Sequence, residues 1–310
     1  MYKTLTVTEA DEGSRIDAFV ARVLPEVSRR LAKTLAREGH IRCAGRVVPG
    51  AHLVRAGEAV EVRLPTAQPE VATPTADVLG LTERFVYLHK PAGLHTVRLR
   101  PDDPPTLADV ARGVEPACAE ASPDPRECGA LHRLDVSTSG VVAFARSATA
   151  WREGREAIAN AWKLYLARVE QPAKTWPPPP SAHVRIHADR PRWPTGTSLD
   201  PPSQEGTRVT WPLISTGPRG RRIEADDGGS PAASRIWPLN ADGAVFAIEL
   251  LTGRRHQIRV HMASLGLPLE GDGLYGCAPG DAQVLLHAWA FQLEPAEPLI
   301  VAPAPGWSQS

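Results

Sequence analysis

The 310-residue chain has few cysteines, no excess of charge of either sign and no long apolar run. Its four cysteines, Cys43, Cys118, Cys128 and Cys277, are widely separated and form no C-x-x-C pair. This argues against a structural zinc site and against a disulfide framework. No stretch has the length of a membrane span, and the first residues contain no apolar signal segment. We therefore expect a cytoplasmic protein with no metal site and no membrane contact.

The formal net charge is zero, from 35 basic and 35 acidic residues, and this counts against nucleic-acid binding by the chain as a whole. The charge is unevenly distributed, however, because residues 14–65 contain ten basic and five acidic side chains. A hydrophobic content of 42% is sufficient for a packed core and argues against global disorder. At this length we expect one large domain and one small one.

Residues 13–65 have the pattern of a compact module, in which two helices are followed by short strands. The second helix is expected over residues 29–38. Arg29, Arg30 and Lys33 lie about one turn apart on it, so they can follow a phosphate backbone. Taken alone, these charges would also suit a helix face that is merely solvated.

This module resembles the S4 RNA-binding domain. The matching segments are R-I-D at 15–17, S-R at 28–29, G-H-I at 39–41, G-R-V-V at 45–48 and the glycine at 57. In S4 domains the second helix carries the cations that face RNA, so the resemblance assigns RNA binding to Arg29, Arg30 and Lys33. A linker rich in Pro, Ala and Thr is expected over 66–79, and the larger domain over 80–305.

The most informative segment of the larger domain is H-R-L-D-V-S-T-S-G at 132–140, which leads into the apolar run 141–145. Asp135 stands between a basic neighbour and a Thr-Ser-Gly turn, at the start of a predicted buried strand, where a carboxylate can be held rigidly. An isolated aspartate in such a turn is more often a turn-forming or capping residue. Two further motifs follow downstream: K-L-Y-L-A at 163–167, and T-G-R-R-H-Q-I-R-V-H at 252–261 with G-L-P-L-E-G-D-G-L-Y-G at 266–276.

Together with K-P-A-G at 90–93 and L-H-A at 286–288, these motifs resemble those of the RluA-like pseudouridine synthases of ribosomal RNA and tRNA. The resemblance implies that Asp135 is the nucleophile. It also implies that Tyr165 stacks on the target base and transfers a proton, and that Arg259 pairs with Asp135. Arg133 would occupy the space left by a flipped base, and Leu286 would form part of the pocket wall. Neither a metal nor another cofactor is expected.

The implied fold is α+β, with a small S4 domain followed by a catalytic domain. The catalytic domain would have a central, mostly antiparallel mixed sheet flanked by helices and loops, and the irregular order of predicted strands favours this over a repeating βαβ layout. Residues 258, 261, 262 and 265 recur at helical spacing and predict an amphipathic helix, with Thr252 as its N-cap. Residues 171–232 are rich in proline and glycine and match the family poorly.

Pseudouridine forms when the N-glycosidic bond of uridine breaks and the same base rejoins the ribose through C5. A carboxylate can attack either C1′ of the ribose or C6 of the uracil, and the sequence leaves both open. A neighbouring guanidinium favours the ionised form of a carboxyl group and orients it. The target atoms cannot be reached inside a stacked helix, so the base must flip out. The expected function is RNA pseudouridine synthesis by a monomer; the S4 domain favours ribosomal RNA as the substrate over tRNA, which stays open.

Three alternatives compete with this function. A catalytically idle RNA-binding or ribosome-assembly protein would have the same fold, although that role places no demand on the three predicted catalytic residues. A serine hydrolase could use His132 and Ser139, although G-x-S-x-G is absent. His256 and His261 could bind a metal, but they are five residues apart and do not share a helix face.

Overall fold

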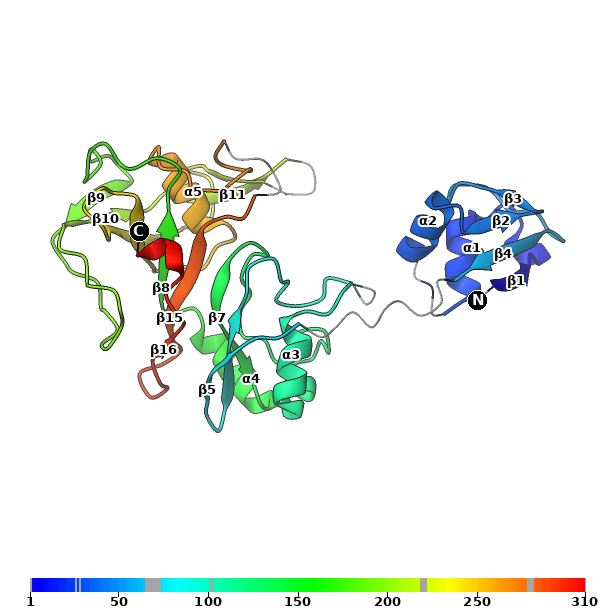
Figure 1. The fold of residues 1–310 in the computed structure, drawn as a ribbon, viewed down its shortest axis with the longest axis horizontal. Coiled ribbons are helices and arrows are strands. Elements are labelled where there is room, and N and C mark those ends of the chain that lie inside the picture. The colour runs from blue at the N-terminus through cyan, green and yellow to red at the C-terminus, as the bar shows by residue number, and fades with distance from the viewer. Residues whose placement is uncertain are drawn as a thin grey trace. The chain divides into compact units, whose positions relative to one another are not determined.

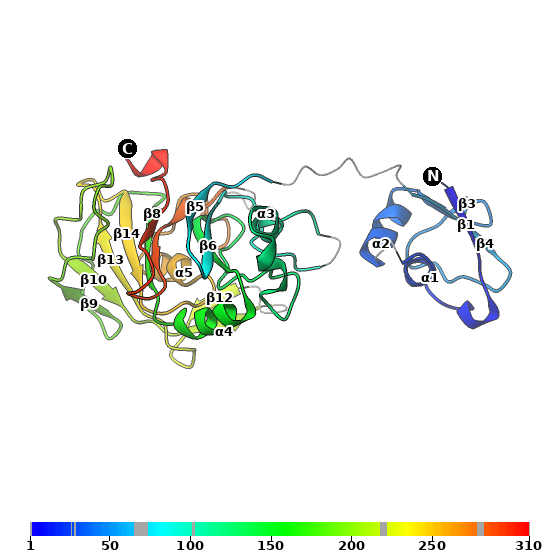
Figure 2. The same ribbon diagram turned by 90° about the horizontal axis from the view of Figure 1, so that it is seen from below.

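The computed structural model describes residues 2–25, 27, 29–64, 74–100, 103–217, 222–277 and 282–309. The chain divides into two compact units, a small N-terminal one and a larger one that includes most residues from Thr73 onward (Figures 1 and 2). Each unit has its own hydrophobic core. Among the described residues, no helix is both long and apolar enough to cross a membrane.

The small unit combines two helices with a four-stranded antiparallel sheet of order β1-β4-β2-β3. Ile16 and Phe19 of the first helix and Leu35 of the second are almost fully buried in the same core as Ile41 and Val62 of the sheet. Both predicted helices are confirmed, and the second presents Arg29 and Lys33 to solvent. The elements are β1 (Tyr2–Thr6), η1 (Glu9–Asp11), α1 (Ile16–Val23), α2 (Arg29–Arg37), β2 (Ile41–Cys43), β3 (Arg46–Val47) and β4 (Ala59–Arg63).

A ten-stranded sheet forms the centre of the larger unit, in the order β5-β6-β7-β15-β8-β14-β13-β10-β9, with β16 beside β15. All neighbouring strands pair antiparallel except β7 and β15, which are parallel. The mostly antiparallel mixed sheet predicted from the sequence is confirmed. Its strands are β5 (Val78–Leu81), β6 (Phe85–Lys90), β7 (Ser139–Ala145), β8 (Trp162–Arg168), β9 (Val184–His187), β10 (Gly206–Val209), β13 (Ser234–Pro238), β14 (Val245–Leu250), β15 (Leu286–Gln292) and β16 (Ile300–Val301).

Helices cover both faces of this sheet because successive side chains of a strand point to opposite sides. On β6, Phe85 and Tyr87 share a core with Ala150 of α4, whereas Val86 and Leu88 share another core with α3. The helix that follows β14, α5, packs on the same face as the odd-numbered residues of β8. The remaining elements are α3 (Leu107–Val114), η2 (Pro116–Glu120), α4 (Ala148–Ala157), the hairpin of β11 (Leu213–Thr216) and β12 (Arg222–Ala225), α5 (Gln257–Ser264) and η4 (Gly306–Ser308).

Several details differ from the sequence-based expectations. Helix α5 begins after His256, so Thr252 is not its N-cap, and the Thr252 hydroxyl instead donates to the side chain of Gln257 at 2.8 Å. The helix is not amphipathic, because one side contacts the sheet and Val260 packs against the β11–β12 hairpin. Strand β5 begins at Val78, inside the segment assigned to the linker, and linker residues 66–73 lie outside the described part.

Candidate active site

The backbone on either side of Asp135 is held by hydrogen bonds in the loop that precedes β7. The Thr96 hydroxyl donates to the carbonyl of Leu134 at 3.1 Å and accepts from its N–H at 3.2 Å. The N–H of Thr138 donates to the carbonyl of Asp135 at 3.0 Å and closes a turn. The carboxylate therefore projects from a loop whose backbone polar groups have partners.

Lys90 ties a second segment to this loop. Its ammonium is fully buried at the end of β6 and donates to the carbonyls of Pro91, Leu94 and Val136 at 3.0, 2.7 and 3.1 Å. Burial lowers the pKa of Lys90 to about 8, and the charge of Asp135 opposes that shift. The K-P-A-G segment thus fixes the residue directly after Asp135.

Arg259 of α5 faces two carboxylates. Its Nε and one terminal nitrogen donate to the two oxygens of Asp272, both at 2.7 Å, and its other terminal nitrogen lies 3.6 Å from an oxygen of Asp135. Asp272 is fully buried and also accepts from the N–H groups of Leu274 and Tyr275. Burial would raise the pKa of Asp272, but the Arg259 guanidinium holds it below its usual value. The expected pairing of Arg259 with Asp135 is therefore present as an ion pair of 3.6 Å, and the structure adds Asp272 as a closer, hydrogen-bonded partner.

His256, the residue before α5, also faces Asp135. Its Nε2 lies 3.7 Å from the Asp135 carboxylate, and its Nδ1 lies 2.8 Å from the hydroxyl of Tyr275. The guanidinium of Arg259 lies over the Tyr275 ring, 5.1 Å from its centre. No catalytic role was predicted for His256, Asp272 or Tyr275, although all three lie inside the motifs at 252–261 and 266–276.

A cavity of about 860 Å³ opens beside Asp135. Tyr165 of β8, Leu286 at the start of β15, Arg259 and the exposed Arg133 also line it. The Asp135 side chain is 31% exposed, so a ligand in the cavity can reach it. Burial, followed by the Asp135 charge, raises the pKa of Tyr165, so its phenol is protonated at neutral pH. The structure brings all five of these predicted site residues together.

Three other predicted residues, Arg29, Arg30 and Lys33, belong to α2 of the small unit. Arg29 and Lys33 are exposed and one turn apart, and Arg29 lies 3.4 Å from the buried Asp17. The side chain of Arg30 lies outside the described part of the structure. Arg37, one turn further along, is also exposed and extends the same basic row.

Comparisons with known proteins support both units. The S4 domain model matches residues 14–60, and the RNA pseudouridylate synthase model matches residues 84–264, more than half of the chain. The chain belongs to the RNA pseudouridylate synthase family. This synthase is therefore an isomerase that forms pseudouridine in RNA, as the sequence predicted.

Named relatives and a solved structure agree with this family. Ribosomal large subunit pseudouridine synthase D of Xylella fastidiosa is 32% identical over 284 residues, which cover 87% of this synthase and 74% of that protein. Ribosomal large subunit pseudouridine synthase C of Haemophilus influenzae is 25% identical, over 94% of this chain and 87% of its own. Human RNA pseudouridylate synthase domain containing 1 shares the fold, with a TM-score of 0.50 and 19% identity, over 76% of this chain and 84% of that one.

The serine-hydrolase alternative is wrong, because His132 and Ser139 do not form a pair in the synthase. The Ser139 hydroxyl lies 2.8 Å from Nδ1 of His287. The ring of His132 stacks on Phe291, with centres 5.0 Å apart, and its Nε2 accepts from the N–H of Ala143. His132 is therefore a packing residue that is turned away from the serine.

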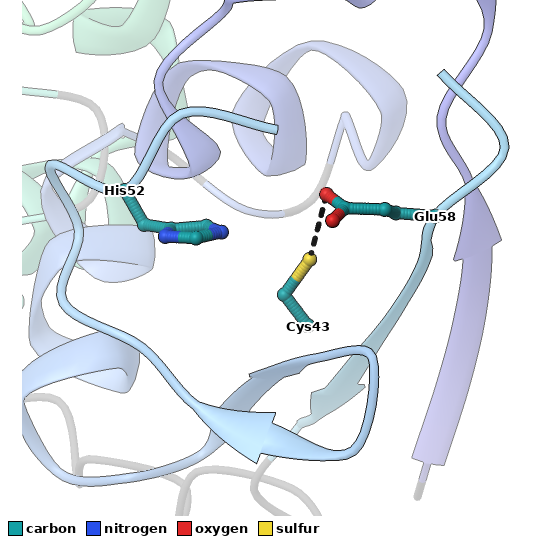
Figure 3. A group of neighbouring side chains, drawn as sticks. All are labelled: Cys43, His52 and Glu58. Atoms are coloured by element: carbon teal, nitrogen blue, oxygen red, sulfur yellow. Dashed lines mark hydrogen bonds between the residues drawn. The ribbon is translucent and has the colours of Figure 1, made fainter. Parts of the chain in front are cut away.

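One group of possible metal ligands occurs among the described residues, in the small unit (Figure 3). The ligand atoms of Cys43, His52 and Glu58 lie within 4.8 Å of one another. The Cys43 thiol donates to Glu58 at 3.2 Å, and Glu58 also accepts from the N–H of Arg55. Burial, and then Glu58, raises the pKa of this thiol to about 11, whereas metal binding requires a thiolate. The position of Glu58 beside Cys43 is thus explained by the two hydrogen bonds that its carboxylate accepts, one from the Cys43 thiol and one from the N–H of Arg55.

Proposed function

We propose that the synthase isomerises uridines of large-subunit ribosomal RNA and that Asp135 is its nucleophile. One observation carries the proposal: Asp135 is the carboxylate that lines the cavity, with nitrogens of Arg259 and His256 at 3.6 and 3.7 Å from it and the Tyr165 side chain in the same cavity wall. The names of the two ribosomal relatives support the choice of RNA.

The reaction is balanced without a co-reactant. The bond between C1′ and N1 breaks, a bond between C1′ and C5 forms, the hydrogen on C5 is lost and N1 gains a hydrogen. Asp135 would add to C1′ or to C6, so that the base can detach, rotate and rejoin. The aromatic ring of Tyr165 offers a stacking surface, and stacking of a base on an aromatic ring is worth about 1–3 kcal/mol.

Binding of the RNA would involve both units. Arg133 lies at the cavity, where an exposed guanidinium can fill the space left by the flipped uridine. In the small unit, Arg29, Arg30 and Lys33 would contact phosphates. Leu286 forms an apolar part of the cavity wall, which suits a base that has left its stack. The proposal includes a monomeric enzyme that acts in the cytoplasm.

Substitution of the nucleophile tests the proposal. Asp135→Asn keeps the shape of the side chain but removes its negative charge, so pseudouridine formation should fall by at least about 10³-fold. The assay incubates protein with large-subunit ribosomal RNA or tRNA transcripts and maps pseudouridine with a carbodiimide label and primer extension. Wild-type protein should modify the ribosomal transcript.

The same assay separates the alternatives. Full activity of Asp135→Asn would contradict the assignment of the nucleophile. Modification of tRNA alone would contradict the choice of RNA. RNA binding without any modification by wild-type protein would favour the catalytically idle alternative. Maps of total RNA with and without the gene would identify the uridine.

A further inference from the structure

His256 lies between Asp135 and Tyr275 and has an uncommon backbone conformation. Its φ angle is +54°, in the left-handed region that side-chain-bearing residues seldom adopt and that recurs at functional sites. The residue stands directly before α5, and its two ring nitrogens point to different partners. Nε2 lies 3.7 Å from the Asp135 carboxylate, and Nδ1 lies 2.8 Å from the Tyr275 hydroxyl.

The partners of Tyr275 favour one position for the ring proton of His256. The backbone N–H of Ile223 donates to the Tyr275 hydroxyl at 3.0 Å. Within the described ranges, the other hydrogen-bond partner of this hydroxyl is Nδ1 of His256. With the Ile223 N–H already donating to the oxygen, the arrangement favours the O–H proton on the side of Nδ1, with Nδ1 as its acceptor. A neutral imidazole that accepts at Nδ1 carries its own proton on Nε2, the nitrogen nearest to Asp135.

We propose that His256 is a positioning residue of the synthase: a neutral imidazole that directs its Nε2–H at Asp135, with its tautomer set by Tyr275. The inference rests on the proposed function in one respect, since it takes Asp135 as the nucleophile. His256 acts through Asp135 rather than on the RNA.

Burial favours the neutral ring of His256. Burial is the largest effect on the pKa of His256 and lowers it, and the cations Arg259 and Arg255 act in the same direction. Asp135 and Asp272 oppose this shift but do not reverse it. The imidazole is therefore neutral near neutral pH, and it offers Asp135 a donor without adding a positive charge.

A neutral donor suits a carboxylate that must attack. The charge of Arg259 is already balanced by Asp272 through two hydrogen bonds of 2.7 Å, so Asp135 supplies the net negative charge of the site. An imidazolium would form a strong second ion pair with Asp135 and make it a weaker nucleophile. At 3.7 Å, Nε2 lies beyond normal hydrogen-bond range of the carboxylate in the free enzyme, and the Nε2–H can close on it when uridine enters.

Two variants of matched length test the role of the donor. His256→Met removes the N–H, whereas His256→Gln can place an amide N–H near the position of Nε2, and both carry the same left-handed backbone. We expect His256→Met to lower kcat by about 10- to 100-fold with little change in KM, and His256→Gln to recover most of that loss. Equal kcat values for both variants, whether high or low, would overturn the proposal.

The tautomer is measured directly, without RNA. In ¹⁵N-histidine-labelled enzyme at neutral pH, the His256 signals, assigned by their loss in His256→Gln, should show a neutral ring protonated at Nε2. Tyr275→Phe removes the proton donor to Nδ1, so the Nδ1–H form should become populated. A charged ring, or an Nδ1–H ring in the wild type, would refute the proposal even if Asp135 is essential. Full activity of Asp135→Asn would instead refute the proposed nucleophile, which keeps the two failures distinct.

Discussion

Arg259 and Asp272 form a buried ion pair that orients the guanidinium toward Asp135. The Asp272 side chain is fully buried and that of Arg259 is 9% exposed, so each charge depends on the other for compensation. The two hydrogen bonds use Nε and one terminal nitrogen, which leaves the second terminal nitrogen for Asp135. At the residue scale, the ion pair with Asp272 therefore determines which nitrogen of Arg259 faces the carboxylate of Asp135.

Breaking this pair should destabilise the larger unit. Asp272→Asn keeps an acceptor for the N–H groups of Leu274 and Tyr275 but leaves the buried Arg259 charge with only its longer contact to Asp135, so it should cost about 3 kcal/mol in the free energy of unfolding. The double variant Arg259→Met with Asp272→Asn should recover most of that loss and stay inactive. Urea unfolding followed by tryptophan fluorescence measures both, and equal stabilities of the single and double variants would contradict the ion-pair argument.

At the scale of elements, the parallel pairing of β7 with β15 places Asp135 near the start of β15. Gly140 of β7 pairs with Ala288 of β15, and a Cβ at position 140 would lie 2.1 Å from the Ala288 carbonyl oxygen. Its φ angle of +119° also disfavours any other residue. The final glycine of the H-R-L-D-V-S-T-S-G segment is therefore required by the close approach of two backbones.

Gly140→Ala should separate these strands. We expect a loss of about 3 kcal/mol or more in unfolding free energy, together with loss of activity, because the Asp135 loop continues into β7. Gly113→Ala is the matched control, since that glycine lies in α3 with open space around it and an ordinary φ angle. The control should be neutral or stabilised by up to about 1 kcal/mol. An equally small effect at Gly140 would show that the strands can move apart without cost.

At the scale of the whole molecule, buried neutral histidines make the larger unit sensitive to acid. Burial lowers the pKa of His261 to about 4 and that of His287 to about 3, against about 6.5 in an unfolded chain. Between about pH 6.5 and 4 the unfolded chain binds protons that the folded chain does not. Stability should therefore fall with falling pH, by up to about 1.4 kcal/mol per pH unit for each histidine.

Urea unfolding at pH 7.5, 6.5, 5.5 and 4.5 checks this expectation. All eight tryptophans lie at position 151 or beyond, so their fluorescence reports on the larger unit. His261→Gln removes one titrating group and should reduce the slope of stability against pH. A stability that does not change between pH 6.5 and 4.5 would contradict the assignment of neutral, buried rings.

The small unit should govern how RNA affinity depends on salt. Replacing Arg29, Arg30 and Lys33 by Ala should weaken binding and reduce the slope of log affinity against log salt by about one for each phosphate that the variant no longer neutralises. The matched control replaces three exposed cations outside α2, namely Arg42, Arg46 and Arg55. Equal slopes for the two triple variants would show that total charge, rather than the face of α2, attracts the RNA.

Much of the fold could be predicted because many of its helices and strands depend on residues that are close together in the sequence. The two helices of the small unit and the strands around Asp135 follow from apolar periodicity and turn residues. The start of α5 could not be predicted, because Thr252 has capping chemistry but its hydroxyl is bonded to Gln257. The burial of α5 on several sides was also missed, since the β11–β12 hairpin that covers Val260 comes from a segment with weak patterning.

The sequence alone determined the family and the presence of a basic N-terminal module. It also identified Asp135, Tyr165 and Arg259 as candidate catalytic residues, because each lies in a contiguous motif. Only the tertiary structure decided that Arg259 binds Asp272 before Asp135, and that His256 and Tyr275 complete the surroundings of the carboxylate. The physical reason is that a charge selects its partner by distance and burial in space. Those quantities are set where α5, the segment 266–276 and the Asp135 loop meet, and no single motif contains all three.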